Sequence, residues 1–211
     1  MVTHSNNISR KSLEIFLQNI EKISSYKINL EQYPTDSYTA SFILWNAYFD
    51  GNIAQKNVID LGTGNGILAM GSVYLGAASV TAVDIDPEAI EIARRNSIEN
   101  GLNINFKNCD VSDISGEYDT VIMNPPYGSV NRHADLPFIK KAFEIGYYIY
   151  SIHNFKSLDF VRKLYEECGE IIRMNEIEIA VPHIYQHHKK DLYHIKSVLI
   201  YAKSKKHEKI I

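Results

Sequence analysis

The motif with the clearest chemical meaning is the run Asn124-Pro125-Pro126-Tyr127. Each proline fixes a backbone dihedral angle, so the amide oxygen of Asn124 and the carbonyl oxygen of Pro125 can be held facing the same point. Both atoms accept hydrogen bonds and suit the two hydrogens of a planar NH₂ group. The ring of Tyr127 offers a face on which a planar base or amide can stack. The motif therefore predicts a pocket for a planar amino group.

A glycine-rich turn, Gly62-Thr63-Gly64-Asn65-Gly66, follows the apolar run at 57–62. Glycine tolerates positive φ and lets the backbone come close to a ligand. The dinucleotide fingerprint G-x-G-x-x-G would need a glycine where Ile67 stands, which disfavours NAD. The sequence predicts a ligand-binding turn, and the alternative is a tight strand-to-helix turn that binds nothing.

Two carboxylates follow later predicted strands. Asp84 ends the run at 79–85 and lies 22 residues after Gly62, where a carboxylate can accept both hydroxyls of a ribose. Asp110 follows the run at 104–108 and could accept the amine of an adenine, although a solvated loop aspartate is the alternative. Ligands of open α/β sheets bind beyond the carboxyl ends of the strands, so we expect both to face the glycine turn.

The elements that position these residues alternate between apolar runs and amphipathic segments. Apolar residues from Leu13 to Ile23 fall on one helical stripe, and Asp86-Pro87 is a good start for a helix over 86–100. The other predicted helices are 36–49, one through 70–75, and 157–167; the predicted strands are 57–62, 79–85, 104–108, 118–124, 147–152, 176–181 and 194–202. This order predicts a parallel, doubly wound α/β sheet with an antiparallel pair at its C-terminal end.

Composition excludes several classes of protein. The 211 residues are 45% hydrophobic with a net charge of −3, too apolar and balanced for a disordered chain. No apolar run approaches the roughly 20 residues that span a bilayer, and no secretory signal is evident, so we expect a cytoplasmic protein without membrane contact. Cys109 and Cys168 are too few for a disulfide framework or a zinc site, and we expect no metal.

Positive charge gathers near the C-terminus. Residues 183–211 hold seven lysines against Asp191 and Glu208, and they include His187-His188-Lys189-Lys190 between the last two predicted strands. This excess suggests a local contact with a polyanion, and a solvated lysine-rich end is the alternative. Adjacent His187 and His188 are poorly placed to share a metal ion.

These motifs, in this order, resemble class I S-adenosylmethionine-dependent methyltransferases of the amino-methylating branch, over roughly residues 35–202. The segments at 30–35 (LEQYPT), 124–135 (NPPYGSVNRHAD), 150–155 (YSIHNF) and 187–190 (HHKK) are similar to the methyltransferase-like protein 5 family and its archaeal relatives. That resemblance implies a Rossmann-like fold, S-adenosylmethionine as cofactor, and N6 methylation of adenosine in small-subunit ribosomal RNA. It also implies a small zinc-binding activator for the eukaryotic members.

The resemblance further implies roles for individual residues. It assigns the target base to Asn124 through Tyr127, where Tyr127 departs from the phenylalanine of eukaryotic members. Residues 1–34 would form an N-terminal helix and a cofactor-covering segment, 35–202 the core of one methyltransferase domain, and 203–211 a basic tail. The cofactor-binding residues would be Gln32, Tyr33, Thr35, Asp60, Gly62, Thr63, Gly64, Asn65, Gly66, Asp84, Ile85, Asp110, Val111 and Asn124.

RNA contacts are expected from Tyr127, His153 and the 187–190 segment, with His153 equally compatible with a packed core histidine. A zinc-ribbon activator could pair with the third predicted strand if it lies at the sheet edge, because Ile104 and Phe106 alternate there with polar residues. The motif at 124–127 also fits protein glutamine N5-methyltransferases and guanine N2-methyltransferases. A non-catalytic RNA-binding module is the remaining alternative.

Overall fold

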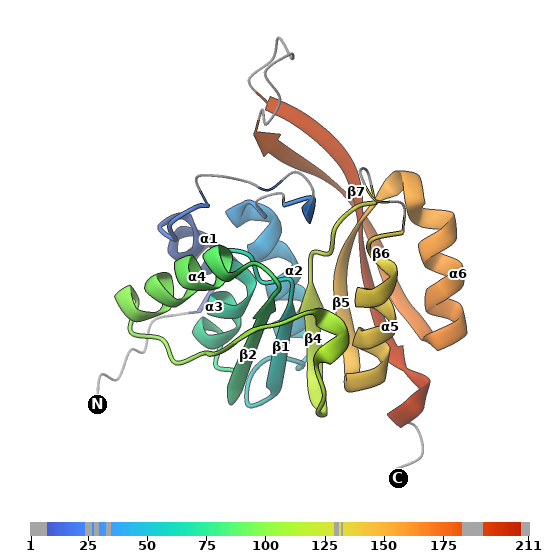
Figure 1. Ribbon diagram of the computed structural model, residues 1–211, viewed down its shortest axis with the longest axis horizontal. Helices are drawn as coiled ribbons and strands as arrows, with labels where there is room; N and C mark the ends of the chain where they lie inside the picture. Colours follow the sequence, from blue (N-terminus) through green and yellow to red (C-terminus); the bar gives the residue numbers. More distant parts are fainter. Residues whose placement is uncertain are drawn as a thin grey trace.

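Strands from both halves of the chain form one seven-stranded sheet in the computed structural model (Figure 1). The structure describes residues 8–23, 27, 30–32, 35–128, 131, 133–182 and 192–207. The strands are β1 (Asn57–Leu61), β2 (Ser79–Asp84), β3 (Asn105–Asn108), β4 (Tyr118–Met123), β5 (Gly146–Asn154), β6 (Gly169–Pro182) and β7 (Leu192–Ser204). Their order is β3-β2-β1-β4-β5-β7-β6, with β7 antiparallel to both of its neighbours. The predicted α/β sheet and its antiparallel C-terminal strand are confirmed.

Helices cover both faces of the sheet (Figure 1). They are α1 (Arg10–Gln18), α2 (Ser37–Phe49), α3 (Ile67–Tyr74), α4 (Pro87–Glu99), α5 (Leu136–Ile145) and α6 (Leu158–Cys168). Helix α4 begins as predicted, because the side chain of Asp86 accepts the N–H of Glu88 and Pro87 occupies the first turn. None of these helices, within the residues described, is long and apolar enough to cross a bilayer.

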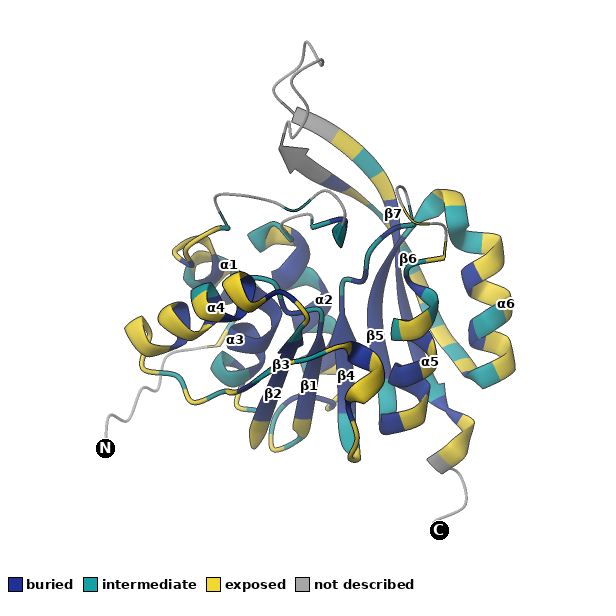
Figure 2. Ribbon diagram, in the orientation of Figure 1, coloured by how far each residue is buried: buried dark blue, intermediate teal, exposed yellow. Residues whose placement is uncertain are grey.

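The core has two layers because adjacent strand residues point to opposite faces. Val58, Ile122 and Tyr150 pack with α1, α2 and α3 on one face, whereas Ile59 and Val121 pack with α5 and α6 on the other. Figure 2 shows this as a dark sheet interior between helices that are exposed on their outer sides. Helices therefore cover both faces of the sheet, which explains why residues 58–61 of β1 are all buried, without alternation.

Three elements differ from the sequence-based predictions. Helix α1 ends at Gln18 rather than continuing the stripe to Ile23, and the freed segment crosses towards the carboxyl ends of the strands. Strand β6 begins at Gly169, ahead of the predicted 176–181, because the edge strand pairs with all of β7. Helix α5 lies between β4 and β5, where no helix was predicted.

Candidate active site

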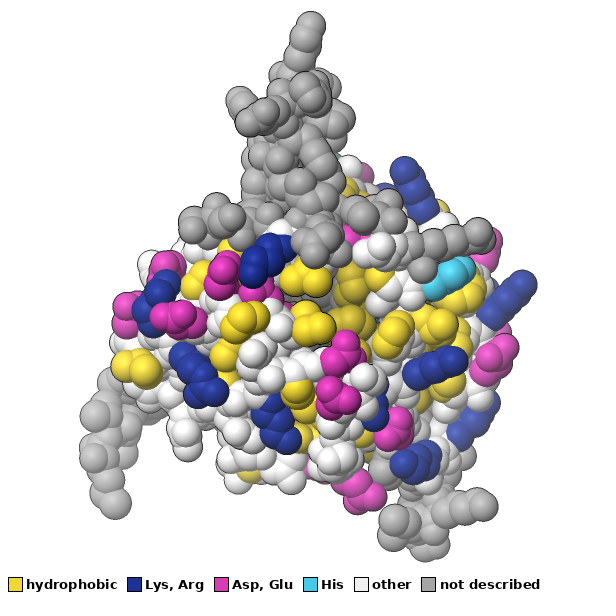
Figure 3. All heavy atoms as spheres, viewed as in Figure 1, with side chains coloured by type: hydrophobic (Ala, Val, Ile, Leu, Met, Phe, Trp, Pro, Cys, Tyr) yellow, Lys and Arg dark blue, Asp and Glu magenta, His cyan; other side chains and the backbone are white. Residues whose placement is uncertain are grey.

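A cavity of about 310 Å³ opens at the carboxyl ends of β1, β2 and β4. This is where the topology of an open parallel sheet places ligands. On the face seen in Figure 3, hydrophobic side chains gather in the middle, with acidic and basic side chains on either side. The predicted site residues that line the cavity are Gln32, Thr35, Gly62, Thr63, Gly64, Asn65, Asp84, Ile85, Asp110, Val111, Asn124, Pro125, Pro126 and Tyr127.

The glycine turn is bonded to the neighbouring strand β2. The N–H groups of Gly62 and Thr63 both donate to the carbonyl of Val83, at 2.9 and 2.8 Å, and the N–H of Gly64 donates to Asp84 Oδ2 at 2.8 Å. Gly62 has a φ of +74°, and a Cβ there would lie 3.1 Å from Cε1 of Phe138. Glycine is therefore required at position 62 both for its conformation and for space beside the cavity.

Asp84 connects this turn to the start of α4. Besides Gly64, its carboxylate accepts the N–H of Asp86 at 3.0 Å. Burial raises the pKa of Asp84 above its ordinary value, and the two backbone hydrogen bonds oppose that rise. Its carboxylate faces the cavity with fixed orientation, which suits it to accept the hydroxyls of a sugar.

Asp60 lies beneath the turn and is absent from the cavity lining. Its Oδ2 accepts from the hydroxyl of Thr63 at 2.6 Å and from the N–H of Ala69 at 3.1 Å. Oδ1 is buried and has no partner among the described residues. Burial raises its pKa to about 7, against hydrogen bonds that lower it. The structure therefore places Asp60 as a support of the turn, rather than as a wall of the cavity. Gly66, which begins α3 in the left-handed conformation, also lies outside the lining.

The far wall of the cavity is apolar with one carboxylate. Ile85 is 51% exposed although it is a large aliphatic residue, and it faces the cavity with Val111. Asp110 Oδ1 accepts from the N–H and the hydroxyl of Ser112, and these bonds hold the pKa of Asp110 below its usual value. An aromatic ring between Ile85 and Val111 would cover this exposed apolar surface, with Asp110 at its edge as an acceptor.

Residues that follow α1 in the chain contribute to the wall of the cavity. We call the described residues 21–23, 27, 30–32 and 35 the N-terminal strap. At its start, the side chain of Asn96 accepts from the N–H of Glu21 and donates to the Glu21 carbonyl. Asn96 also donates to the carbonyl of Asn65 in the glycine turn, so one buried amide joins the strap, α4 and the turn.

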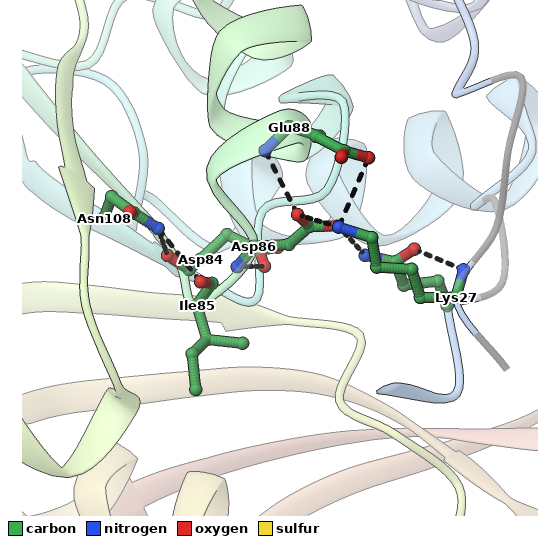
Figure 4. A network of polar contacts seen from close by, with 7 residues as sticks. Lys27, Asp84, Ile85, Asp86, Glu88 and Asn108 are labelled. Atoms are coloured by element: carbon green, nitrogen blue, oxygen red, sulfur yellow. Dashed lines mark hydrogen bonds and ion pairs between the residues drawn. The ribbon is translucent and has the colours of Figure 1, made fainter. Parts of the chain in front are cut away.

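The middle of the strap is held by Asp86 (Figure 4). Lys27 Nζ lies 2.7 Å from Asp86 Oδ1 and 3.2 Å from a carboxylate oxygen of Glu88. Gln32 Nε2 donates to Asp86 Oδ2 at 2.7 Å. Burial opposes ionisation of Asp86, but the bonds from Lys27 and Gln32 prevail and keep its pKa below the ordinary value. The Asp86 carboxylate is thus charged and binds Lys27 and Gln32 of the strap.

The end of the strap meets the Asn124–Tyr127 motif. Asn124 Nδ2 donates to Thr35 Oγ1 at 2.8 Å, while Asn124 Oδ1 is buried and has no partner among the described residues. Glu31 is buried, with a φ of +51°, and its carboxylate accepts the N–H of Asn131 at 2.8 Å. The strap is therefore bonded both to the motif and to the loop that follows it.

His153, an expected RNA contact, is not among the residues that line the cavity. His153 is 1% exposed and lies in a buried cluster, where Nε2 contacts Tyr165 OH at 3.1 Å and Ser151 Oγ at 3.0 Å. Burial lowers its pKa, against the carboxylate of Asp135 that favours the charged form. This placement favours the packed core histidine over the expected RNA contact. Tyr33, His187, His188, Lys189 and Lys190 lie outside the described residues.

The sequence analysis missed several residues of the cavity wall. Phe138 from α5 covers Gly62, and Ile23, Leu30 and Glu31 come from the strap. Leu30 and Glu31 had a signal, because both lie inside the LEQYPT segment that carried the family resemblance. Across the residues described, no group of three or more His, Cys, Asp and Glu side chains is arranged to hold a metal ion.

The residues present fit S-adenosylmethionine. Gly62 and Gly64 open the backbone beneath a ligand, Asp84 suits a ribose, and Ile85, Asp110 and Val111 suit an adenine. Asn124 Oδ1 is buried and has no hydrogen-bond partner among the described residues. A buried acceptor without a donor is unfavourable until a ligand supplies one.

Several known proteins are similar to this chain in sequence, in fold or in both. The family model for ribosomal protein L11 methyltransferase (PrmA) matches residues 44–125, which hold the turn, Asp84 and Asp110. The crystal structure of PH1948 from Pyrococcus horikoshii superposes with a TM-score of 0.85 at 36% identity, covering 92% of this chain and 96% of that chain. Magnesium protoporphyrin IX methyltransferase from Synechocystis PCC 6803, solved with bound SAM, shares the fold at 18% identity, a TM-score of 0.62 and 90% coverage of both chains.

The rRNA N(6)-adenosine-methyltransferase METTL5 of Danio rerio is 37% identical over 192 residues, which cover 85% of this chain and 91% of the relative. The fold is that of class I S-adenosylmethionine-dependent methyltransferases. The chain belongs to the METTL5 family of rRNA N6-adenosine methyltransferases.

Proposed function

We propose that this protein methylates the N6 amine of an adenosine in ribosomal RNA, that of the small subunit, with S-adenosylmethionine as methyl donor. The observation that carries the proposal is the buried, unpartnered Oδ1 of Asn124, beside Pro125 in the wall of the cavity. An exocyclic NH₂ group supplies the donor that this acceptor lacks. Family membership supports adenosine as the base that carries it.

The cofactor, when bound, supplies an electrophilic methyl group on its sulfonium. The chain would hold it with Gly62 and Gly64 beneath, Asp84 at the ribose and Asp110 at the adenine. The N-terminal strap would exclude water from the cavity, since Ile23 and Leu30 contribute apolar surface to the lining.

The target adenosine must leave a base-paired stack to reach this cavity. Asn124 Oδ1 and the Pro125 carbonyl would accept its two amine hydrogens, and these contacts strengthen as the nitrogen gains positive charge. Tyr127, which is 9% exposed and lines the cavity, would contact the ring. No general base is needed before attack, because the alkylated amine becomes strongly acidic.

Protein glutamine and guanine N2 are the alternative acceptors, since each presents the same pair of hydrogens. The match to ribosomal protein L11 methyltransferase covers 44–125, mostly the cofactor-binding half, and does not decide the acceptor. A relative that matches 85% of this chain is an rRNA N(6)-adenosine-methyltransferase, which favours adenosine.

Labelled methyl transfer to separated small-subunit and large-subunit ribosomal RNAs, each free of protein, tests the substrate. We expect incorporation into small-subunit RNA alone. Absence of label from both RNAs, together with label in ribosomal proteins or a glutamine-containing peptide offered in parallel reactions, would overturn the RNA assignment. Label in large-subunit RNA would overturn the choice of subunit.

RNA contacts beyond the cavity are proposed for Lys189 and Lys190, whose ammonium groups suit phosphates. A log–log salt slope of about −0.7 accompanies each neutralised phosphate on a single strand, so Lys189→Ala with Lys190→Ala should flatten the slope by roughly 1.4. An unchanged slope would remove these lysines from the RNA-binding surface.

A small zinc-ribbon activator is proposed to pair along β3, which is an edge strand of the sheet. Arg94 from α4 already donates to the Phe106 carbonyl at 2.9 Å and lies over the Phe106 ring. A pairing strand would have to displace this contact. Arg94→Ala should therefore leave activator binding intact or tighten it, whereas weaker binding in this variant would place the partner elsewhere.

A further inference from the structure

The loop that follows the Asn124–Tyr127 motif places an aromatic side chain at the edge of the cavity. His133 lies between Asn131 and Ala134 in the chain, and both of these residues line the cavity. The His133 side chain is exposed and packs against the ring of Phe160, with ring centroids 4.2 Å apart and an angle of 41° between the rings. In Figure 3, a histidine side chain lies against hydrophobic side chains on the face that carries the cavity. We call His133 and Phe160 the ring pair.

The ring pair keeps surface that a ligand can reach. Phe160 is the third residue of α6 and is 36% exposed, which is unusual for a large apolar ring. Phe155 differs, because Lys196 Nζ lies 3.7 Å from its ring centroid and also pairs with Glu176 at 2.7 Å. A cation therefore already occupies one face of Phe155, whereas the ring pair offers a place where another flat ring can stack.

The backbone of His133 is held in an uncommon conformation. Its φ is +63°, in the left-handed region that is unfavourable for a residue with a Cβ. Its carbonyl accepts the N–H of Leu136 at 3.0 Å, and the N–H of Ala134 donates to the carbonyl of Asn131 at 3.0 Å. These bonds fix the turn that brings the imidazole onto Phe160. Residues held in this way cluster at ligand-binding sites, which agrees with a binding role for the loop.

Two lysines accompany the ring pair. Lys163 lies one helical turn after Phe160, so both side chains project from the same side of α6. Lys156 lies in the short helix η3 (Phe155–Ser157), immediately before α6. Both lysines are exposed, and neither forms an ion pair with a described residue. The segment 155–163 carries Lys156, Arg162 and Lys163 against Asp159, a net charge of +2.

These features together fit a single strand of RNA. Proteins that bind single strands combine aromatic rings, on which bases stack, with cations that follow the phosphates. The target adenosine has to leave its stack to enter the cavity, so the nucleotide beside it is also released to contact the rim. A protein substrate has no phosphates for the lysines to contact, which favours RNA.

We propose that the ring pair stacks on the base next to the target adenosine, while Lys156 and Lys163 contact phosphates of the same strand. This inference rests on the proposed function, because it requires an RNA strand that enters the cavity. It adds a contact surface at the rim to the one proposed for Lys189 and Lys190. Every base has a face that can stack, so this surface holds the strand and leaves the choice of base to the cavity.

Two substitutions remove one ring each and preserve the local backbone. Asparagine tolerates the left-handed conformation, so His133→Asn loses the imidazole without new strain, and Phe160→Leu keeps an apolar side chain on α6. A short fluorescein-labelled oligoadenylate serves as the single strand, and fluorescence anisotropy measures its affinity. We expect each variant to bind it about five- to tenfold more weakly than the wild type, the lower end of the range for a base on an aromatic ring.

Two further variants control for packing and for position. Phe160→Tyr keeps a ring and should keep the wild-type affinity. Phe49→Leu removes a phenylalanine that is 81% exposed at the end of α2, which leads to the start of β1 at the opposite edge of the sheet from the cavity. Its affinity for oligoadenylate should equal that of the wild type. An equal loss of affinity in Phe49→Leu and Phe160→Leu would overturn the placement of the strand.

Ionic strength separates the lysines from the rings. Lys163→Gln should flatten the log–log salt slope of oligoadenylate binding by about 0.7, the value for one phosphate on a single strand. Phe160→Leu should lower the affinity and leave this slope unchanged, because stacking neutralises no phosphate. A wild-type slope in Lys163→Gln would overturn the phosphate contact.

Methyl transfer distinguishes this inference from the proposed function. With small-subunit ribosomal RNA as substrate, His133→Asn and Phe160→Leu should raise KM for the RNA and leave kcat and the affinity for S-adenosylmethionine near their wild-type values. Wild-type oligoadenylate affinity in both variants, or no binding by the wild type, would overturn the ring pair as an RNA contact even if RNA is methylated. If the wild type methylates no RNA, the proposed function fails, while weaker oligoadenylate binding by the two variants still supports the ring pair as an RNA-binding surface.

Discussion

Lys27 Nζ lies 2.7 Å from Oδ1 of Asp86, the residue that also caps helix α4 (Figure 4). The Asp86 carboxylate thereby caps helix α4 and also binds Lys27 of the N-terminal strap. The strap is thus bonded to a residue that lies two positions after Asp84, the last residue of β2. Loss of this ion pair should loosen the strap and leave the sheet intact.

Lys27→Met is therefore expected to speed dissociation of S-adenosylmethionine several-fold, with a smaller effect at high salt because screening already weakens the wild-type pair. Stopped-flow release measured at low and high ionic strength checks this. Arg162→Met removes an ion pair to Glu166 of similar length on the outside of α6 and serves as control. Identical release rates for Lys27→Met and Arg162→Met would show that the strap is held by other contacts.

Asp60 makes stability depend on pH. Its pKa is raised by burial from 3.8 to about 7, so the folded protein binds more protons than the unfolded chain between these values. Its contribution to stability is therefore largest at low pH and declines as pH rises from about 4 to about 7. Asp60→Asn should remove this decline and stabilise the cofactor-free protein above pH 7, by an amount on the order of 4 kcal/mol at most.

Urea unfolding of both proteins between pH 5 and pH 8 measures this difference. Asp119→Asn loses a partly exposed carboxylate that accepts from the N–H of Asn57, away from the cavity, and controls for the change of side chain. Parallel pH profiles for the wild type and Asp60→Asn would contradict the assignment.

Gly62→Ala should weaken cofactor binding, because the new Cβ would lie 3.1 Å from Cε1 of Phe138 and the residue has a φ of +74°. Gly76→Ala is a matched control, since its φ is +86° but no atom lies within 4 Å of its Cβ. Both variants should lose about 1–2 kcal/mol of stability from the left-handed conformation. Calorimetry should show reduced cofactor affinity in Gly62→Ala alone, and equal affinities in the two variants would contradict crowding beside the cavity.

Asp84→Ala should weaken cofactor binding roughly ten- to hundredfold, which corresponds to the loss of a charged hydrogen-bond partner worth about 1.5–3 kcal/mol. The turn also loses its bond from Gly64, so the melting temperature should be recorded beside the calorimetric affinity. A folded variant with wild-type affinity would remove Asp84 from the cofactor site.

The sequence predicted the sheet and the turn because their signals are local. Apolar runs such as 57–61 mark buried strands, and Asp86-Pro87 marks a helix start. Helix α5 was missed although its sequence carries a local signal, because Ile139, Ala142, Phe143 and Ile145 follow Pro137 at the spacing of a buried helical stripe. Phe143 packs against Tyr165 of α6.

The contacts that complete the site could not be predicted from local sequence patterns, because they join residues that are far apart in the chain. Thr35 and Asn124 are 89 residues apart in the chain, and Glu31 and Asn131 are 100 apart. Each pair joins the strap to the motif or its following loop, and each residue alone is an ordinary polar side chain. His153 illustrates the reverse case, because its motif suggested an RNA contact while its burial depends on α6.

The most direct test of the account is the chemical identity of the methylated product. The protein is incubated with ribosomal RNA and S-adenosylmethionine carrying a deuterated methyl group, and the RNA is digested to nucleosides for mass spectrometry. We predict deuterated N6-methyladenosine with the wild type and none with Asn124→Ala, which should still bind the cofactor. Deuterated N2-methylguanosine, or N6-methyladenosine formed at the wild-type rate by Asn124→Ala, would contradict the account.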